Sequence, residues 1–364
     1  MGHPVGEMMV QLLKKKEEKA ALPAKNPEEY DIKARPDRVG KYFKKYTKNF
    51  VFDEFSDAFI KKTGMEIMRG VPIPLRKQDL EEFKGGSGLK MQHIAENIAW
   101  IMGIDPKFEH MEKYLEFMQK FSNNKIVNGL VKEGRDAAEN KDYDNAAIHF
   151  RAALCIAPTS IHPMYSYARV CRELYLSSNN EEYIGRFKAE SLEYFELLVE
   201  SHPRYSEAYY YLGFAYVNLG LYVKAKLTWE QFMKRTSILK DKKEISTRLK
   251  QLEQPVKIEE GYNAVLSGRY ELGIDILEPF LKTKFKDWWP MSYYLGIAYL
   301  RTGDTKEAVA SFKRVLGINP SHVETMDELA NIYAESKDKE NETKYRKKAE
   351  LIRSGGHKEK TGGN

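Results

Sequence analysis

Hydrophobic and small residues recur in the same order in two segments of the chain, 209–233 and 292–320. Each segment has Leu-Gly, then an aromatic residue, a second Gly, an Ala and another aromatic residue at matching intervals. The matching residues are Leu212, Gly213, Tyr216, Gly220, Ala225 and Trp229 in the first segment, and Leu295, Gly296, Tyr299, Gly303, Ala308 and Phe312 in the second. This spacing predicts two amphipathic helices in each segment. Gly220 and Gly303 are expected to end the first helix of each pair.

Further segments align with this pattern residue by residue. The units are 127–160 (Gly134, Tyr143, Ala146, Phe150, Ala153, Pro158), 161–205 (Ala168, Phe195, Pro203), 206–237, 254–288 (Gly261, Gly268, Tyr270, Phe280), 289–322 (ending at Pro320) and 323–352 (Leu329, Ala330, Tyr333, Ala349). The second unit carries a polar insert at 177–185, and a Lys-rich helical stretch, 241–254, precedes the fourth unit. That fourth unit is degenerate, with Gly273 where the others have Ala.

The spacing resembles the tetratricopeptide repeat (TPR), a helix pair of about 34 residues. The resemblance covers residues 127–352 and implies an all-α fold: a right-handed α-solenoid of about six TPR-like helix pairs with an N-terminal helical region. We predict a basic N-terminal helix and linker at 1–38, the helical region at 39–126, the TPR solenoid at 127–352 and a disordered tail at 353–364.

In this family the first helices of successive repeats line a concave groove that binds a segment of a partner protein. The resemblance therefore implies a set of first-helix side chains that would contact the partner. They are Tyr165, Arg169 and Arg172; Tyr210, Tyr211, Phe214 and Asn218; Ile258, Tyr262 and Val265; and Tyr293, Tyr294, Ile297 and Arg301. Tyr and Arg are the residue types that anchor partners best. The alternative for any one ring is packing between neighbouring helices.

One branch of the family holds the C-terminal carboxylate of chaperones with Lys and Asn side chains on the first helices. The equivalent positions here are Val131, Arg135, Ser166 and Tyr211. The carboxylate clamp is therefore missing, and the resemblance favours a less acidic, more apolar partner segment.

Aromatic residues crowd the segment 39–59. They are Tyr42, Phe43, Tyr46, Phe50, Phe52, Phe55 and Phe59. Spacings of three and four predict a helix with a buried face, interrupted near Asn49. The alternative, a helix lying on a membrane surface, is disfavoured by the acidic residues Asp53, Glu54 and Asp57.

An extended segment is predicted at 70–75, because Pro72 and Pro74 exclude regular helix there. Two helices are expected next, at 89–103 and 106–121. The Gly-Ile-Asp-Pro sequence between them supplies a stop and a new start.

Nothing at the level of motifs indicates catalysis. The Gly-rich segment 84–88 lacks the spacing of a phosphate-binding loop. His93 and His110 have carboxylates at helical spacing, whereas a metal site needs three or four converging ligands. We therefore predict no enzyme activity, no cofactor and no metal. An enzyme or metal site within 26–125 is the weaker alternative.

The formal charge of +6 belongs to the ends of the chain. Residues 1–50 contain twelve Lys and Arg against seven Asp and Glu, and residues 353–364 contain three against one. Residues 51–352 are consequently almost neutral. A repeat region without a basic stripe does not favour nucleic-acid binding.

The two cysteines, Cys155 and Cys171, supply no disulfide framework and are expected to be buried small hydrophobes. No apolar run approaches the roughly 20 residues of a membrane-spanning helix. The apolar stretch 8–13 is too short for the core of a signal peptide. These features predict a cytoplasmic protein with reduced thiols.

The sequence thus predicts an adaptor or assembly factor that binds a protein or peptide segment in a Tyr-rich groove. The alternative is autoregulation, in which the N-terminal helix or the segment 70–75 occupies the groove until a partner displaces it. The identity of the partner and the oligomeric state are left open, and self-association is compatible with the pattern.

Overall fold

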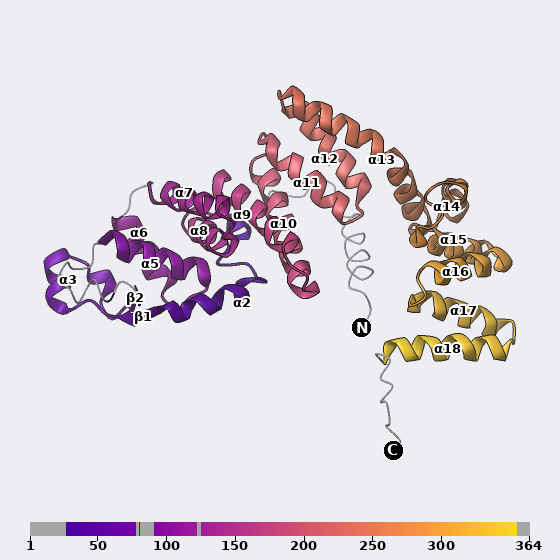
Figure 1. Ribbon diagram of the computed structural model, residues 1–364, viewed down its shortest axis with the longest axis horizontal. Helices are drawn as coiled ribbons and strands as arrows, with labels where there is room; N and C mark the ends of the chain where they lie inside the picture. The colour runs from indigo at the N-terminus through magenta and orange to yellow at the C-terminus, as the bar shows by residue number, and fades with distance from the viewer. Residues whose placement is uncertain (1–26, 78–79, 81–90, 122–124, 355–364) are drawn as a thin grey trace, which may run out of the picture. The chain divides into compact units, whose positions relative to one another are not determined.

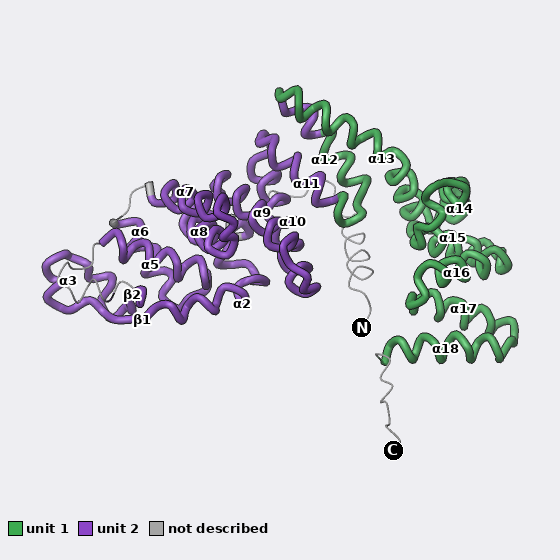
Figure 2. The backbone as a smooth tube through the Cα atoms, viewed as in Figure 1, with its two compact units in different colours: residues 1–21, 217–230, 237–364 green, residues 22–216, 231–236 purple. Residues whose placement is uncertain are grey.

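The structure is a computed structural model that describes residues 27–77, 80, 91–121 and 125–354. They form antiparallel helix pairs and, near the N-terminus, a small two-stranded antiparallel sheet (Figure 1). The chain divides into two compact units (Figure 2). Among the described residues, unit 1 comprises 217–230 and 237–354, and unit 2 comprises those from 27 to 216 together with 231–236.

The repeat helices lie at the positions that the sequence predicted. They are α7 (Lys125–Glu139), α8 (Tyr143–Ile156), α9 (Ile161–Leu176), α10 (Glu181–Ser201), α11 (Ser206–Asn218), α12 (Tyr222–Arg235), α13 (Leu239–Leu266), α14 (Tyr270–Leu277), α15 (Trp289–Thr302), α16 (Thr305–Ile318), α17 (Val323–Glu335) and α18 (Lys339–Arg353). The all-α solenoid of TPR-like helix pairs is confirmed.

In two of the repeats, the Gly of the first helix and the Phe of the second helix pack against one another. A Cβ added at Gly134 would lie 2.7 Å from the Phe150 ring, and one at Gly296 would lie 2.6 Å from the Phe312 ring. In these two helix pairs, the Phe ring of the second helix therefore rests on the bare backbone of the first helix. Because both phenylalanines are almost completely buried, this contact forms part of the repeat core.

The helix ends follow the predicted signals. Gly220 and Gly303 have φ values of 71° and 89°, in the left-handed region, and Gly303 caps α15. Several of the second helices begin after a polar N-cap residue. Asp142 and Asp304 cap α8 and α16 by accepting hydrogen bonds from backbone N–H groups one turn further on.

One boundary differs from the prediction. The Lys-rich stretch and the first helix of the degenerate repeat form the single helix α13, with Pro255 inside it. Apolar positions continue through the junction, and Ile245, Leu252 and Val256 are all buried. Burial of this continuous face offsets the backbone hydrogen bond that the proline removes.

The described N-terminal elements of unit 2 include both short helices and strands. They are η1 (Pro27–Tyr30), α2 (Gly40–Phe43), η2 (Lys44–Asn49), β1 (Phe50–Asp53), α3 (Asp57–Thr63), η3 (Glu66–Met68), β2 (Ile73–Arg76), α5 (Met91–Ile104) and α6 (Met111–Phe121). The two helices expected at 89–103 and 106–121 are present as α5 and α6.

The helix predicted across 39–59 is wrong for its central part. An interruption does occur at Asn49, where η2 ends, but β1 follows and pairs antiparallel with β2. Phe50 is buried and pairs with Arg76 of β2, whereas Phe52 is 39% exposed, so the aromatic residues of this segment do not form one buried helical face. Pairing with a distant strand decided this conformation, and aromatic spacing did not indicate it.

The extended segment predicted at 70–75 is present as β2 from Ile73 onward, whereas Gly70 has a φ of 67° and lies in the preceding turn. Val71, Ile73 and Leu75 are buried, and the hydroxyl of Tyr114 on α6 donates a hydrogen bond to the Pro72 carbonyl at 2.6 Å. The segment is therefore part of the hydrophobic core of unit 2.

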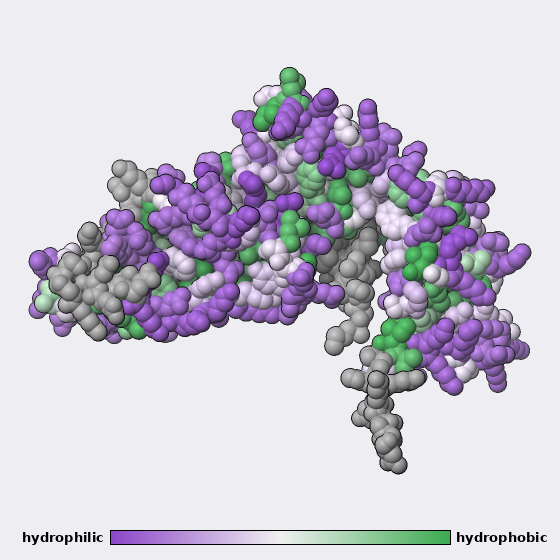
Figure 3. Space-filling view, viewed as in Figure 1, coloured by the Kyte–Doolittle hydropathy of each residue, from purple (hydrophilic) through white to green (hydrophobic). Residues whose placement is uncertain are grey.

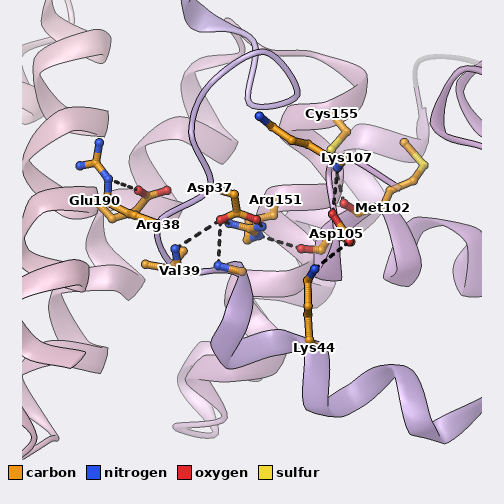
Figure 4. A network of polar contacts seen from close by, with 12 residues as sticks. Asp37, Arg38, Val39, Lys44, Met102, Asp105, Lys107, Arg151, Cys155 and Glu190 are labelled. Atoms are coloured by element: carbon orange, nitrogen blue, oxygen red, sulfur yellow. Dashed lines mark hydrogen bonds and ion pairs between the residues drawn. The ribbon is translucent and has the colours of Figure 1, made fainter. Parts of the chain in front are cut away.

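Residues 27–38, predicted as part of a linker, instead pack onto the repeats. Tyr30 and Ile32 are buried, and Asp37 reaches a fully buried arginine, Arg151 of α8 (Figure 4). The Nη2 atom of Arg151 lies 2.6 Å from an Asp37 carboxylate oxygen. The backbone N–H groups of Val39 and Gly40 donate to the other oxygen of this carboxylate.

This polar network connects the segment 27–38 with α5, α8, α9 and α10 of unit 2. Arg151 also donates from Nε to the Gly103 carbonyl of α5 at 2.7 Å and from Nη1 to the Tyr167 hydroxyl of α9 at 3.2 Å. Tyr167 in turn donates to the buried carboxylate of Glu190 on α10 at 3.1 Å. Burial raises the pKa of Glu190, although Arg151 and Arg38 oppose the shift.

Several predicted features lie outside the described residues. These are the basic N-terminal helix before residue 26, the Gly-rich segment 84–88 and the tail from residue 355. Among the helices that the structure describes, none has the length and apolar character needed to cross a membrane.

Candidate protein-binding surfaces

The predicted groove residues fall into two sets, one in each compact unit. The set in unit 2 lies on α9 and α11 and consists of Tyr165, Arg169, Arg172, Tyr210, Tyr211 and Phe214. The set in unit 1 consists of Asn218, Ile258, Tyr262, Val265, Tyr293, Tyr294, Ile297 and Arg301.

Four residues of unit 2 form what we call the Tyr–Arg cluster: Tyr165, Arg169, Tyr205 and Tyr211. The Tyr165 ring lies edge-on to Tyr205 at 5.5 Å and to Tyr211 at 5.7 Å, measured between ring centroids. The Arg169 guanidinium lies 5.5 Å from the Tyr165 centroid and 5.1 Å from that of Tyr211. The rings are half-buried and Arg169 is exposed, so the cluster presents a cation on an aromatic base.

Local sequence explains why these side chains meet. Tyr165 and Arg169 are four residues apart and share one face of α9. Tyr211 stacks on Phe195 of α10, with centroids 5.7 Å apart and nearly parallel rings, which anchors its inner edge. The cluster therefore has a supported inner side and a solvent-facing outer side.

The cluster is electropositive. Burial, together with Glu207, raises the pKa of Tyr205 to about 12, while the nearby charges of Arg135 and Arg169 oppose this rise. Among the residues that the structure describes, neither Arg135 nor Arg169 belongs to an ion pair. Both guanidiniums thus keep hydrogen-bond donors available for an anionic group.

A pocket of about 470 Å³ adjoins the first turn of α9, on the α7 side. Its lining is mostly polar and consists of Asn128, Val131, Lys132, Arg135, Asp136, Glu139 and His162. Arg135 belongs to this lining and also acts on Tyr205, so the pocket and the Tyr–Arg cluster share a cationic side chain.

The remaining unit 2 residues of the predicted set have local partners. Tyr210 packs against Phe214 and Phe232, at centroid distances of 5.1 Å and 5.4 Å, and so contributes to the contact between successive helices. Arg172 donates to the carboxylate of Glu173 at 2.7 Å.

In unit 1 the structure buries part of the predicted surface. Ile258, Tyr262 and Val265 of α13 are only 0%, 6% and 3% exposed, so the expectation that they face the groove is wrong. They belong to the core formed where α13 packs against α14 and α15. Tyr294 covers this core, with its ring centroid 4.7 Å from that of Tyr262.

The outer part of the unit 1 set has the opposite electrostatic character. Tyr293 is half-buried, and its ring lies 5.1 Å from His322. Burial raises the pKa of Tyr293, and the carboxylates of Glu328 and Glu324 raise it further. Arg301 and Asn218 are exposed. This surface is therefore aromatic and acidic, whereas the Tyr–Arg cluster is aromatic and basic.

Sequence reasoning missed Tyr205 and treated Arg135 only as an absent clamp ligand. Tyr205 precedes α11 in the inter-repeat loop, outside the first-helix positions that the repeat pattern selects. The sequence could have indicated Tyr205 through its position directly after Pro203-Arg204, in the loop between two repeats. A side chain at such a position can contact the preceding repeat.

The segment 70–75 does not lie in a groove, in contrast to one form of the autoregulatory alternative. It forms β2 and is buried between β1 and helices α5 and α6. The other form of that alternative involves the N-terminal helix, which lies outside the described residues.

The two cysteines are both buried, and the potential metal ligands of the described residues are dispersed. Burial raises the pKa of Cys155 to about 12, and Cys171 is also fully buried. In the described ranges, no three His, Cys, Asp or Glu side chains converge in a way that could hold a metal ion.

Comparisons with known proteins identify two of the repeats. Two family models, both described as tetratricopeptide repeat, match residues 207–235 and 291–322. These ranges correspond to the helix pairs α11–α12 and α15–α16. A search of curated proteins found no significant match.

Several solved structures resemble the chain at low identity. The TPR domain of P58(IPK) is 16% identical with a TM-score of 0.39, and the match covers 64% of this chain and 61% of that domain. PilW, a type IV pilus biogenesis factor, is 15% identical with a TM-score of 0.31, covering 65% and 96%. A tetratricopeptide repeat protein from Parabacteroides merdae is 16% identical with a TM-score of 0.30, covering 69% and 92%.

Proposed function

Because this chain is a tetratricopeptide-repeat protein, we propose that it is a protein-interaction scaffold that binds a partner segment on the Tyr–Arg cluster of unit 2. One observation carries the proposal: an exposed arginine, Arg169, lies on two half-buried tyrosine rings and has no ion pair among the described residues. Tyr and Arg in this arrangement offer contact area and directed donors at modest entropic cost.

The chemistry of the cluster suggests what the partner segment contains. An apolar or aromatic side chain would cover the exposed edges of Tyr165 and Tyr211, contributing about 1–3 kcal/mol. A neighbouring carboxylate would accept hydrogen bonds from Arg169 or Arg135. We therefore propose a short segment that combines an apolar anchor with an acidic residue.

This proposal revises the expectation of a less acidic ligand. That expectation came from the missing Lys and Asn of the carboxylate clamp, and positions Val131 and Ser166 are indeed buried. The cationic groups available here come instead from Arg135 and Arg169. The proposed acidic group is a side chain within the segment, and it does not need to be a chain terminus.

The proposed function predicts a strong effect of Arg169→Glu. Peptides are first selected on the purified full-length protein from a phage-displayed random library. We expect the enriched peptides to contain an acidic residue beside an aromatic or aliphatic one. Their affinity, measured by fluorescence anisotropy, should fall at least about tenfold in the variant, because the carboxylate then meets a like charge.

The matched control is Lys226→Glu on α12, which changes the net charge equally at an exposed position. It should leave the affinity of the selected peptides unchanged. Far-ultraviolet circular dichroism should show equal helicity in both variants. Equal binding to Arg169→Glu, or selected peptides without acidic residues, would show that the partner segment binds elsewhere.

Among the residues that the structure describes, no three His, Cys, Asp or Glu side chains could hold a metal ion together. Protein binding is the function that the geometry of the Tyr–Arg cluster supports best.

A further inference from the structure

The start of α13 exposes two large aliphatic side chains next to each other. Ile238 is the N-cap residue and Leu239 the first residue of the helix, with exposed fractions of 51% and 81%. Leu239 is the most exposed of the large hydrophobic residues that the structure describes. The space-filling view shows hydrophobic atoms bordered by hydrophilic ones at this end of α13 (Figure 3).

Lysines follow the aliphatic pair directly. Lys240, Lys242 and Lys243 lie in the first turns of α13, and Lys240 and Lys243 are exposed. None of the three forms an ion pair with any residue that the structure describes. Residues 237–250 contain five Lys and Arg against two Asp and Glu, whereas the chain from 51 to 352 is almost neutral.

We propose that this tip, which consists of Ile238, Leu239, Lys240, Lys242 and Lys243, binds the surface of an anionic lipid bilayer. The two aliphatic side chains would enter the boundary between headgroups and acyl chains. The lysines would remain at the level of the lipid phosphates. The proposal is independent of the protein-binding function of the Tyr–Arg cluster.

The character of the tip favours a bilayer over a folded protein partner. A stable protein interface has a desolvated core, in which lysine is depleted, and a polar rim around it. The pocket described above lies in unit 2, and the tip itself consists of aliphatic side chains and flexible ammonium groups. A lysine is a mobile point charge, which suits a diffuse anionic surface better than a fixed carboxylate.

The expected strength is modest. Each lysine near an anionic membrane surface strengthens binding about fivefold, so three lysines contribute about 100-fold. Two aliphatic side chains add a contribution that does not depend on salt. A single tip of this size gives weak and reversible attachment, comparable to one of the two signals that stable anchoring requires.

The test is co-sedimentation of the full-length protein with phosphatidylcholine vesicles, with and without phosphatidylserine. We expect binding only when phosphatidylserine is present, and weaker binding at high salt. The variant Leu239→Asp with Ile238→Asp should bind at least about tenfold more weakly. The double variant Lys240→Glu, Lys243→Glu should also bind the vesicles more weakly than the wild type. This loss of affinity should be larger at low salt than at high salt, because salt screens the attraction of the lysines.

The control variant is Leu272→Asp on α14. Leu272 is 42% exposed, but its neighbours include Glu271 and Asp275 instead of lysines, so vesicle binding should not change. The basic segment 1–26 is retained in every variant, and any binding of its own is therefore constant across the series.

Three results would overturn the proposal. The first is absence of binding to phosphatidylserine vesicles, as expected if the tip binds an acidic protein instead. The second is equal binding by the Leu239→Asp, Ile238→Asp variant. The third is a result in which the wild type sediments as a dimer and this variant as a monomer, while both bind the vesicles equally. That result would show that the tip is a contact between copies of the chain.

Discussion

Replacing Asp37 by Ala is expected to lower the free energy of unfolding by about 3–5 kcal/mol, because it leaves a buried cation without its counter-ion. The Arg151 side chain is 0% exposed, and Asp37 accepts two hydrogen bonds from its guanidinium. The variant also removes the acceptor for the Val39 and Gly40 N–H groups, which holds the N-terminal segment on the repeats.

The measurement is urea denaturation followed by circular dichroism, with the unfolding of unit 2 monitored separately if the two units unfold in different transitions. Lys44→Ala serves as the control. It removes an exposed ion pair, in which the Lys44 Nζ atom lies 3.4 Å from Asp105, and should cost no more than about 1 kcal/mol. A loss below 1 kcal/mol in Asp37→Ala would show that Arg151 does not depend on this carboxylate.

The same carboxylate predicts a pH dependence. Burial alone would raise the pKa of Asp37, but the Arg151 charge and the hydrogen bonds outweigh it, so the folded pKa lies below its ordinary value of 3.8. A group with a lowered folded pKa contributes stability above its unfolded pKa and loses that contribution as the pH falls through its folded pKa. The stability difference between wild type and Asp37→Asn should therefore narrow below about pH 3.8.

Gly103→Ala is expected to destabilise the protein by about 3 kcal/mol through overpacking at a backbone contact. A Cβ at this position would lie 2.1 Å from the carbonyl oxygen of Ile148 and 2.9 Å from its carbonyl carbon. The backbones of α5 and α8 would have to separate. That movement would also withdraw the Gly103 carbonyl from the Nε atom of Arg151.

A second glycine inside a helix, Gly185, is expected to show the opposite change in stability on substitution by Ala. Gly185 lies inside α10, and no atom within 4 Å would meet a Cβ added there. Gly185→Ala should stabilise the protein by about 0.5–1 kcal/mol, because alanine loses less backbone entropy in a helix. Thermal unfolding of both variants checks the pair of predictions. Similar stability in Gly103→Ala and wild type would mean that α5 can move away from α8 at little cost.

The predictable part of the candidate surface follows from local spacing. Tyr165 and Arg169 were identified because they occupy first-helix positions in a repeat pattern, and they do lie together. Tyr205 was missed because it belongs to a loop, and loop conformation is not encoded in helical periodicity. Tyr262 was predicted to face the groove but is buried, because α13 packs against both α14 and α15. Residue spacing within one helix does not indicate how many other helices pack against it.

The sequence by itself determined the repeats, since the Gly and aromatic positions that define them are local and recur along the chain. Gly134 with Phe150, and Gly296 with Phe312, make the same contact within their own helix pairs. The helix ends at Gly220 and Gly303 followed from the same local rule.

Only the tertiary structure decided the organisation of residues 27–121. Phe50 to Asp53 became a strand because they pair with Ile73 to Arg76, residues that lie 20 to 26 positions further along the sequence. Gly103, expected as a stop between helices, lies within α5 and permits its close approach to α8. Asp37 and Arg151 are separated by 114 positions, and no periodic pattern connects them. Their attraction depends on burial in a common core, and burial is a property that only the assembled chain possesses.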